Sequence, residues 1–100
     1  MENFSFVLPI PPAHACYKDH FPDNPLVPGA LLMCWLGELL KDQYAMTLAG
    51  IKQIKFLAPV LPGHELQIAA KVTATQLSVV ATHQGIDLFK GTLLLKTTGC

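Results

Sequence analysis

The sequence predicts an α+β fold in which an antiparallel sheet wraps around one long helix, and two observations predict it. Apolar residues between positions 28 and 43 recur at intervals of three and four, which is typical of a helix. After this segment the chain alternates apolar and polar residues through several runs, with no second helical pattern. One helix followed by consecutive strands favours an antiparallel sheet, and 100 residues are enough for a single domain over 1–100.

The first quarter of the chain predicts one strand followed by constrained loop. Over residues 3–8, Phe4, Phe6 and Leu8 would face one side of a strand and Ser5 the other. Prolines at positions 9, 11 and 12 end this strand. Residues 15–18 would add a turn or a short strand.

The helix is predicted over residues 28–43. Pro28 suits its first turn, where the missing N–H has no partner to lose. Polar residues appear only late in the segment, so the helix is apolar nearly all round, and we expect protein to surround it. The apolar positions are Leu31, Leu32, Met33, Cys34, Trp35, Leu36, Leu39 and Leu40.

Four strands are predicted after the helix. The first contains Ile51, Ile54, Phe56 and Val60, is interrupted by Pro59 and is closed by a turn at positions 62–63. The next two cover residues 66–74 and 77–83, with a turn at positions 84–85. The last covers residues 86–97, where Gly91 marks a bulge or a close-packing point, and residues 99–100 form a tail.

Composition narrows the class of protein. Hydrophobic residues make up 51% of the chain and charged residues 14%, so we expect the excess apolar surface to form a two-fold dimer interface. Seven lysines, no arginine and seven acidic residues argue against nucleic-acid binding. The apolar run over 26–36 is too short to span a membrane, and residues 1–4 lack the features of a signal peptide. Three unpatterned cysteines then indicate a reduced, cytoplasmic protein.

A proline-rich loop over residues 20–29 places a histidine just before the helix. Each proline fixes its own φ and restricts the preceding residue, so the loop has few conformations. Gly29 then leaves room for another molecule to approach the free N–H groups of the helix start. A titratable ring beside a positively polarised helix end is suited to catalysis.

Two motifs in the chain resemble those of a known family. Residues 20–29 read His-Phe-Pro-x-x-Pro-x-x-Pro-Gly, which resembles the active-site signature of the hotdog-fold 3-hydroxyacyl-acyl-carrier-protein dehydratases. Residues 54–66 resemble the family's Lys-Phe-x-x-Pro-Val-x-Pro-Gly-Asp-x-Leu segment, with His64 at the aspartate position. The resemblance implies a hotdog fold and homodimers with continuous sheets, in some members assembled as hexamers. It implies acyl carrier protein or another acyl thioester as partner, and no metal or organic cofactor.

The resemblance also implies a reaction and roles for particular residues. The reaction is dehydration of a (3R)-hydroxyacyl thioester to the trans-2-enoyl thioester, in fatty-acid or specialised lipid and polyene biosynthesis. His20 matches the catalytic histidine, and an ordinary imidazole pKa near ~6.5 suits proton transfer at neutral pH. Gly29 matches the glycine whose N–H binds the thioester carbonyl, and it has a second reading as a residue that permits tight packing. Phe21 and Pro28 are expected beside the substrate.

The sequence departs from the family at its acidic residue. That residue lies fourteen positions after the histidine and acts from the neighbouring subunit; here the position holds Cys34, a poor hydrogen-bond donor that reads equally as a pocket or a core residue. Glu38, one helical turn further, is the nearest substitute acid. Relatives in specialised pathways carry His next to Trp there, and Cys34 next to Trp35 is closer to that branch.

The missing carboxylate leaves other functions open. A second hypothesis is a non-catalytic or assisting subunit that binds acyl carrier protein or acyl chains, and a third is a thioesterase. The remaining histidines, His14, His64 and His83, read as surface or strand residues rather than as a zinc site.

Overall fold

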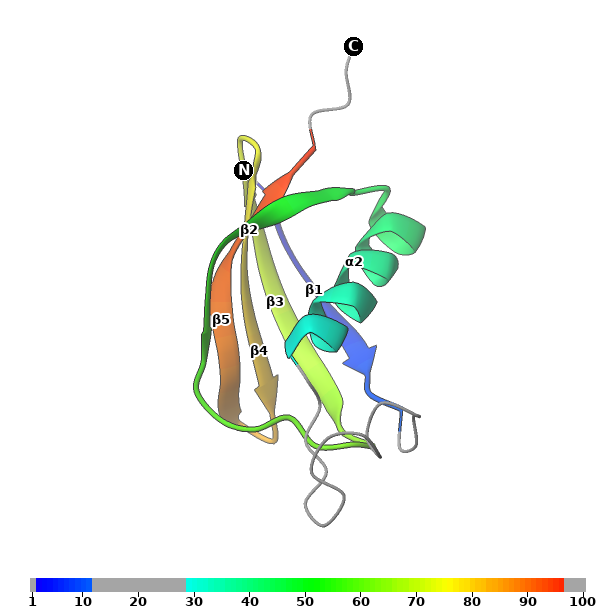
Figure 1. Ribbon diagram of the computed structural model, residues 1–100, viewed down its shortest axis with the longest axis vertical. Coiled ribbons are helices and arrows are strands. Elements are labelled where there is room, and N and C mark those ends of the chain that lie inside the picture. Colours follow the sequence, from blue (N-terminus) through cyan, green and yellow to red (C-terminus); the bar gives the residue numbers. More distant parts are fainter. Residues whose placement is uncertain (1, 12–28, 97–100) are drawn as a thin grey trace.

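Five antiparallel strands curve around one helix in the part of the chain that the structure describes (Figure 1). The structure is a computed structural model and describes residues 2–11 and 29–96. The turn expected at residues 15–18 and the tail at 99–100 lie outside these ranges. The predicted α+β fold is confirmed, with one helix ahead of four consecutive strands. The elements are β1 (Glu2–Pro9), α2 (Gly29–Tyr44), β2 (Leu48–Phe56), β3 (Glu65–Thr73), β4 (Gln76–His83) and β5 (Ile86–Leu95).

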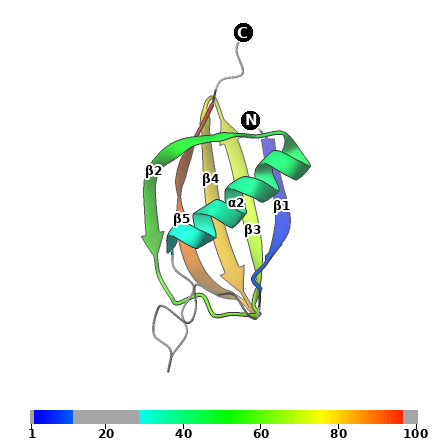
Figure 2. The same ribbon diagram turned by 45° about the vertical axis from the view of Figure 1, so that its right-hand side comes forward.

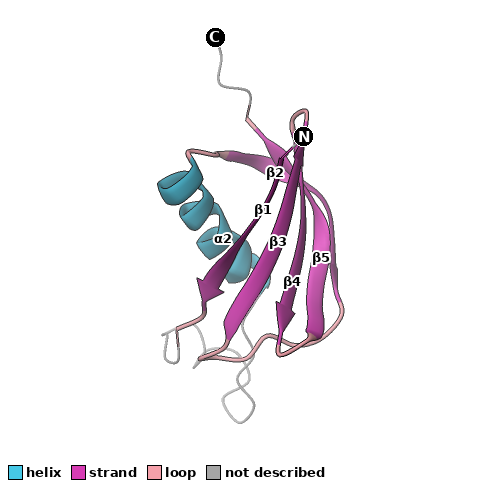
Figure 3. Ribbon diagram, turned by 180° about the vertical axis from the view of Figure 1, so that it is seen from behind, coloured by secondary structure: helices cyan, strands magenta, loops and turns pink. Residues whose placement is uncertain are grey.

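The sheet has the order β1-β3-β4-β5-β2, and each neighbouring pair is antiparallel. The two strands that flank α2 in the sequence are therefore the two edges of the sheet. The helix crosses the concave face diagonally, from the β2 and β5 side to β1 (Figure 2). Seen from behind, no described helix covers the convex face (Figure 3).

The alternating strands bury one face against the helix, as their pattern predicts. In β3, Leu66, Ile68 and Ala70 are buried while the residues between them are exposed. The partner strand β4 alternates in the same way, with Val79 paired to Ala70 in register. The turn at Gln84 and Gly85 joins β4 to β5, and both residues have positive φ (51° and 80°), as a tight type I′ hairpin requires.

The helix buries one stripe against the sheet. Leu32, Leu36 and Leu40, spaced four apart, have relative exposures of 0–1%. The helix ends where Ala45 takes a positive φ of 56° and its N–H bonds the Lys41 carbonyl at 3.2 Å. Among the described residues, no helix has the length and apolar character needed to cross a membrane.

Aromatic contacts hold the C-terminal end of α2 to the first strand. The Tyr44 ring lies 4.6 Å from the Phe4 ring and 5.5 Å from the Phe6 ring, centroid to centroid. The last turn of the helix is thereby fixed over the β1 edge.

The described residues of a single chain do not by themselves surround α2. Cys34 lies two residues from both Leu32 and Leu36, about 200° round the helix, and its side chain is exposed. Among the described residues only the sheet covers the helix, and these residues leave the side that carries Cys34 exposed. The reading of Cys34 as a core residue is corrected for the same reason.

The strand expected to reach Val60 is shorter than predicted. It ends at Phe56, and Val60 belongs to the following loop, residues 57–64, where it is nonetheless buried. The N–H groups of Leu57 and Ala58 both bond the Leu88 carbonyl, at 2.8 and 3.1 Å, which bends the chain off the regular ladder. The apolar pattern correctly indicated that Val60 is buried, but it did not indicate that the chain leaves the regular strand after Phe56.

Gly91 is a close-packing point, one of its two expected roles. It pairs with Ile54 across β2 and β5. A Cβ at position 91 would overlap the Gln53 carbonyl oxygen and lie 2.9 Å from the Ile54 Cα. The glycine therefore allows the β2 backbone to approach β5, beside a register shift between Ile51 and Gln53.

Candidate active site

The start of α2 places Gly29 against an aromatic ring of β2. Gly29 is the first residue of the helix, where backbone N–H groups have no acceptor within the helix. A Cβ at this position would lie 2.9 Å from the Phe56 Cζ. Both readings of Gly29 are therefore compatible with its position, since it is tightly packed and it stands at a helix N-terminus.

An apolar groove opens beside this glycine. It has a volume of about 380 Å³ and lies between the first turn of α2 and the loop that follows β2. Phe56 forms part of its wall, remains 47% exposed, and packs its ring 5.7 Å from the ring of buried Phe89. A groove of this kind suits a flexible hydrocarbon chain. Its lining residues are Gly29, Leu32, Phe56, Leu57, Ala58, Pro59 and Val60.

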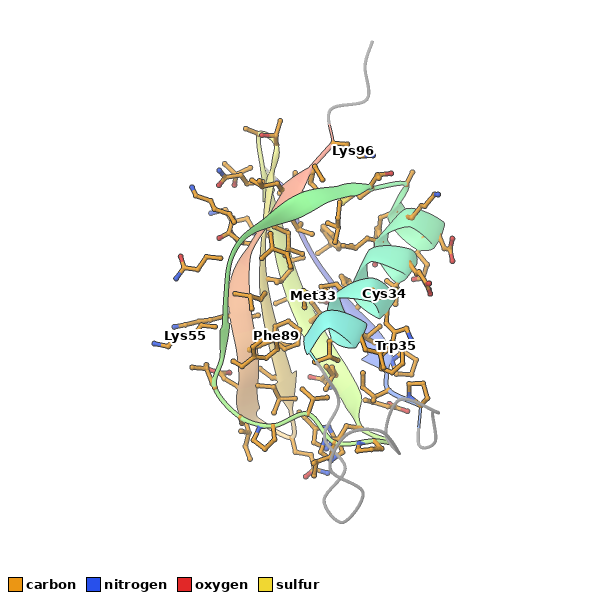
Figure 4. All side chains as sticks on the ribbon, in the orientation of Figure 1. Met33, Cys34, Trp35, Lys55, Phe89 and Lys96 are labelled. Atoms are coloured by element: carbon orange, nitrogen blue, oxygen red, sulfur yellow. The ribbon has the colours of Figure 1, made fainter. Side chains whose placement is uncertain are left out.

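The two candidate acids lie together on the open side of α2. The Cys34 Sγ is 3.8 Å from the Glu38 Oε1, so the thiol donates a weak hydrogen bond to the carboxylate. Both side chains are exposed, and Figure 4 labels Cys34 between Met33 and Trp35 on the helix. They point away from the sheet, so they are available to a molecule or subunit that approaches the helix from outside.

Three of the predicted site residues lie outside the described ranges. These are His20, Phe21 and Pro28, and their roles stay predictions. Gly29 follows Pro28 directly, so the described part of the site begins where the predicted loop ends.

Two histidines that were expected to be separate surface or strand residues are in contact. The rings of His64 and His83 are stacked, with centroids 3.9 Å apart and planes 9° from parallel. Burial, and then the charge of His83, lower the pKa of His64 below its ordinary value of 6.5. In residues 2–11 and 29–96, no three His, Cys, Asp or Glu side chains gather as a metal site would require.

Sequence reasoning missed Phe56 as a site residue and missed this histidine pair. Phe56 does stand in the second motif, which was a usable signal, but its contact with Gly29 joins positions far apart in the chain. No local pattern links positions 64 and 83, because the contact depends on strand register. The replacement of the family's aspartate by His64 was the one available sign.

Comparison with known proteins identifies the family. Residues 1–88 match the model of the ApeI-like family, described as ApeI dehydratase. A 3-hydroxyacyl-[acyl-carrier-protein] dehydratase FabZ from Histophilus somni is 27% identical over 86 residues, which cover 76% of this chain and 52% of that protein. The chain thus spans about half the length of such curated relatives.

Solved structures agree on the fold. The dehydratase heterocomplex ApeI:P from Xenorhabdus doucetiae contains a chain with a TM-score of 0.77 at 20% identity, covering 95% of this chain and 88% of that one. The (R)-hydratase from A. caviae involved in PHA biosynthesis gives 0.68 at 22% identity, covering 95% and 93%. At these identities the likeness establishes the hotdog fold alone. With the family model matched over most of the sequence, the chain belongs to the ApeI-like dehydratase family.

Proposed function

We propose that the protein dehydrates a (3R)-hydroxyacyl thioester carried by acyl carrier protein to the trans-2-enoyl thioester, as part of fatty-acid or specialised lipid and polyene biosynthesis. The match to the ApeI-like dehydratase family over residues 1–88 is the observation that carries this proposal. The helix start at Gly29 and the apolar groove beside it support it, since a thioester carbonyl and a hydrocarbon tail need these two environments.

The proposed reaction divides between a base, an oxyanion site and an acid. His20 takes the C2 proton, and the electrons of that C–H bond form the C2–C3 double bond as the C3–O bond breaks. The N–H of Gly29 donates to the thioester oxygen while negative charge builds there, helped by the positive end of the helix dipole. The leaving hydroxyl takes a proton and departs as water. No metal or organic cofactor takes part.

The acid is proposed to come from a second copy of the chain. Cys34 and Glu38 lie on the uncovered side of α2, 3.8 Å apart, where the family's acid acts across a subunit boundary. Because β2 is an edge strand with exposed Ile51 and Phe56, a homodimer formed edge to edge would continue the sheet and cover apolar surface. Trimers of such dimers are a further possible assembly.

The test is conversion of 3-hydroxyacyl carrier protein to the enoyl form, followed by mass spectrometry of the carrier. We expect turnover by the wild type and a loss of at least ~10²-fold in His20→Ala, because general base catalysis contributes that much or more. His14→Ala serves as the matched control and should retain activity. A correctly folded wild type that is inactive across acyl chain lengths would contradict the proposal.

A second candidate function is an assisting subunit that binds acyl chains or carrier protein without turnover. Cys34 favours it, since the family's carboxylate is absent at that position, and one structural neighbour is described as a dehydratase heterocomplex. It predicts acyl binding without product, and a gain of activity in Cys34→Glu. If the wild type is itself an active dehydratase, Cys34→Glu would change the rate of an existing reaction and would not create a new activity.

A further inference from the structure

The loop between β2 and β3, residues 57–64, ends in the stacked histidine pair. His64 is the last residue of this loop and His83 is the last residue of β4. Their ring centroids are 3.9 Å apart and their planes differ by 9°. The stack therefore joins the loop to the end of β4, at the start of the hairpin that leads into β5.

Backbone hydrogen bonds bring the end of β1 to the same place. The N–H of Ile10 bonds the His64 carbonyl at 2.8 Å, and the N–H of Gly63 bonds the Ile10 carbonyl at 3.1 Å. The Nδ1 of His83 lies 3.0 Å from the Glu65 carbonyl oxygen, a distance at which a protonated Nδ1 donates to it. Three segments distant in the sequence thus meet around two imidazoles.

The geometry favours the neutral form of His64. Its Nδ1 is buried and has no hydrogen-bond partner among the described residues, so protonation would create a buried donor without an acceptor. Two charged rings in a stack would also repel each other. Burial and the charge of His83 lower the pKa of His64 accordingly.

The other charged groups near the pair do not reverse this effect. Glu65 is the neighbour of His64 on β3, and Asp87 on β5 pairs in register with Thr82, next to His83. Both carboxylates would raise the pKa of a histidine, but both are exposed, and the pKa of His64 is lowered. Of the residues that the structure describes at the end of β1, Pro9 and Ile10 carry no charge.

The other end of the same loop forms a wall of the apolar groove. The Leu88 carbonyl fixes the loop where it starts, through the N–H groups of Leu57 and Ala58. Residues 57–60, which line the groove, lie between that attachment and the histidine stack. The groove wall therefore depends on attachments at both ends of one short loop.

We propose that His64 and His83 form a proton-sensitive clamp that positions this wall, so that the groove keeps its shape only while the His64 ring is neutral. The two histidines are positioning residues, since they act through the loop and not on the acyl chain. The effect on acyl binding rests on the proposed function, whereas the effect on stability does not.

The sign of the pH dependence follows from the direction of the shift. Because the folded-state pKa of His64 lies below the unfolded value of 6.5, the stability is fully present above pH 6.5 and is lost as the pH falls toward the folded-state pKa. In this window the unfolding equilibrium constant rises by up to about tenfold per pH unit for the one proton involved.

Imidazole NMR titration and urea unfolding between about pH 8 and about pH 5 test the clamp. We expect His64 to titrate below 6.5 in the wild type and at a higher pH in His83→Gln, whose amide still donates to the Glu65 carbonyl. His64→Phe keeps an aromatic ring at the stack but cannot titrate. The stability of this variant should therefore vary less with pH than the stability of the wild type. Lys96→Gln, which removes a charge just past the end of β5 opposite to the histidine pair, serves as the control and should leave the titration of His64 unchanged.

Two results would overturn the clamp: His64 titrating at or above 6.5 in the wild type, or an equal pH dependence in His64→Phe. If His64→Phe does not fold, the titrations of His64 in the wild type and in His83→Gln decide whether the clamp exists.

Kinetics with a short and a long acyl chain test the link to the groove. As His64 becomes protonated, the KM for the long chain should rise by up to about tenfold relative to the KM for the short chain. The two KM values are compared at each pH, because protonation of the proposed base His20 would lower kcat for both chains alike. His64→Phe should keep the two KM values in constant ratio. A constant ratio of the two KM values in the wild type would contradict the link between the clamp and the groove. Absence of any turnover alongside the expected titration would instead contradict the proposed function and leave the clamp standing.

Discussion

Gly29 meets two requirements of the proposed site, a helix N-terminus that can bind a carbonyl and room for the side chain that lines the groove. It begins α2, where N–H groups are free to donate, and its missing side chain leaves room for the Phe56 ring that lines the groove. The residue type therefore matters both for the approach of a carbonyl and for the shape of the groove. Pro28 fixes the preceding φ, so the sequence specifies this helix start closely.

Gly29→Ala should reduce activity more than stability. The added Cβ would lie 2.9 Å from the Phe56 Cζ, but this ring is 47% exposed and can rotate away, so we expect a change of less than about 1 kcal/mol in unfolding free energy. The displaced ring would disturb the acyl chain, and kcat/KM should fall by roughly tenfold or more. Urea unfolding and steady-state kinetics measure the two effects.

A compensating variant gives the control for this prediction. Phe56→Leu alone shortens the side chain that meets position 29, so the double variant with Gly29→Ala should recover part of the lost activity. Equal losses in the single and double variants would argue against the contact as the cause.

Among the elements, the β2 and β5 pair leaves no room for an added atom at Gly91. A Cβ at Gly91 would overlap the Gln53 carbonyl oxygen, which belongs to the backbone of the pair and cannot rotate away. Gly91→Ala should therefore destabilise the fold by about 1–3 kcal/mol, the usual cost of overpacking. Thermal or urea unfolding measures this loss.

Gly50→Ala is the matched control, on β2, the strand that pairs with β5. The nearest atom to its added Cβ is the Leu94 Cδ1 at 3.9 Å, an ordinary contact, so the stability should hardly change. A similar loss in both variants would mean that glycine flexibility, and not the close approach of β2 to β5, explains the effect of Gly91.

Periodicity predicted the elements well where a single chain decides burial. β3 and β4 alternate as expected, and the α2 stripe of Leu32, Leu36 and Leu40 faces the sheet. The periodicity failed to predict the end of β2, because Val60 remains buried although the chain has already left the sheet there. The apolar pattern of a sequence indicates which side chains are buried. It does not indicate where the backbone hydrogen bonds change partner.

At the scale of the whole molecule, the open sides of the single chain point to an assembly. The edge strand β2 carries Ile51 at 51% exposure, and the outer side of α2 exposes Cys34 in an otherwise apolar stretch. The sequence predicted apolar surface nearly all round this helix, and the described residues of one chain cover only the side that faces the sheet. The remaining surface agrees with the proposed dimer.

Ile51→Lys should shift the proposed dimer toward monomer. A charged side chain at the edge of β2 opposes pairing with another strand, which is how exposed sheet edges avoid association. Ile86→Lys, at a position 60% exposed in the β4–β5 hairpin, is the control and should leave the mass unchanged. Light scattering after size exclusion measures both. A monomeric wild type would contradict the dimer, as would an unchanged mass for Ile51→Lys.

Long-range pairing sets the limit of the sequence prediction. The first motif marked His20 and Gly29 as parts of one site, but the stack of His64 on His83 depends on the register of β3 with β4. The same holds for Phe56 against Gly29. Each contact joins residues that are far apart in the chain, so no local sequence pattern could place them side by side.

The most direct measurement of the central claim follows the reaction in reverse in D₂O. An enoyl thioester on carrier protein is incubated with the wild type and with His20→Ala, and the product is examined by mass spectrometry and NMR. A dehydratase should add water across the double bond and place one deuterium at C2 in the wild type, with a loss of at least ~10²-fold in His20→Ala. Unchanged enoyl thioester with a folded wild type, or equal deuteration by both proteins, would contradict the assignment.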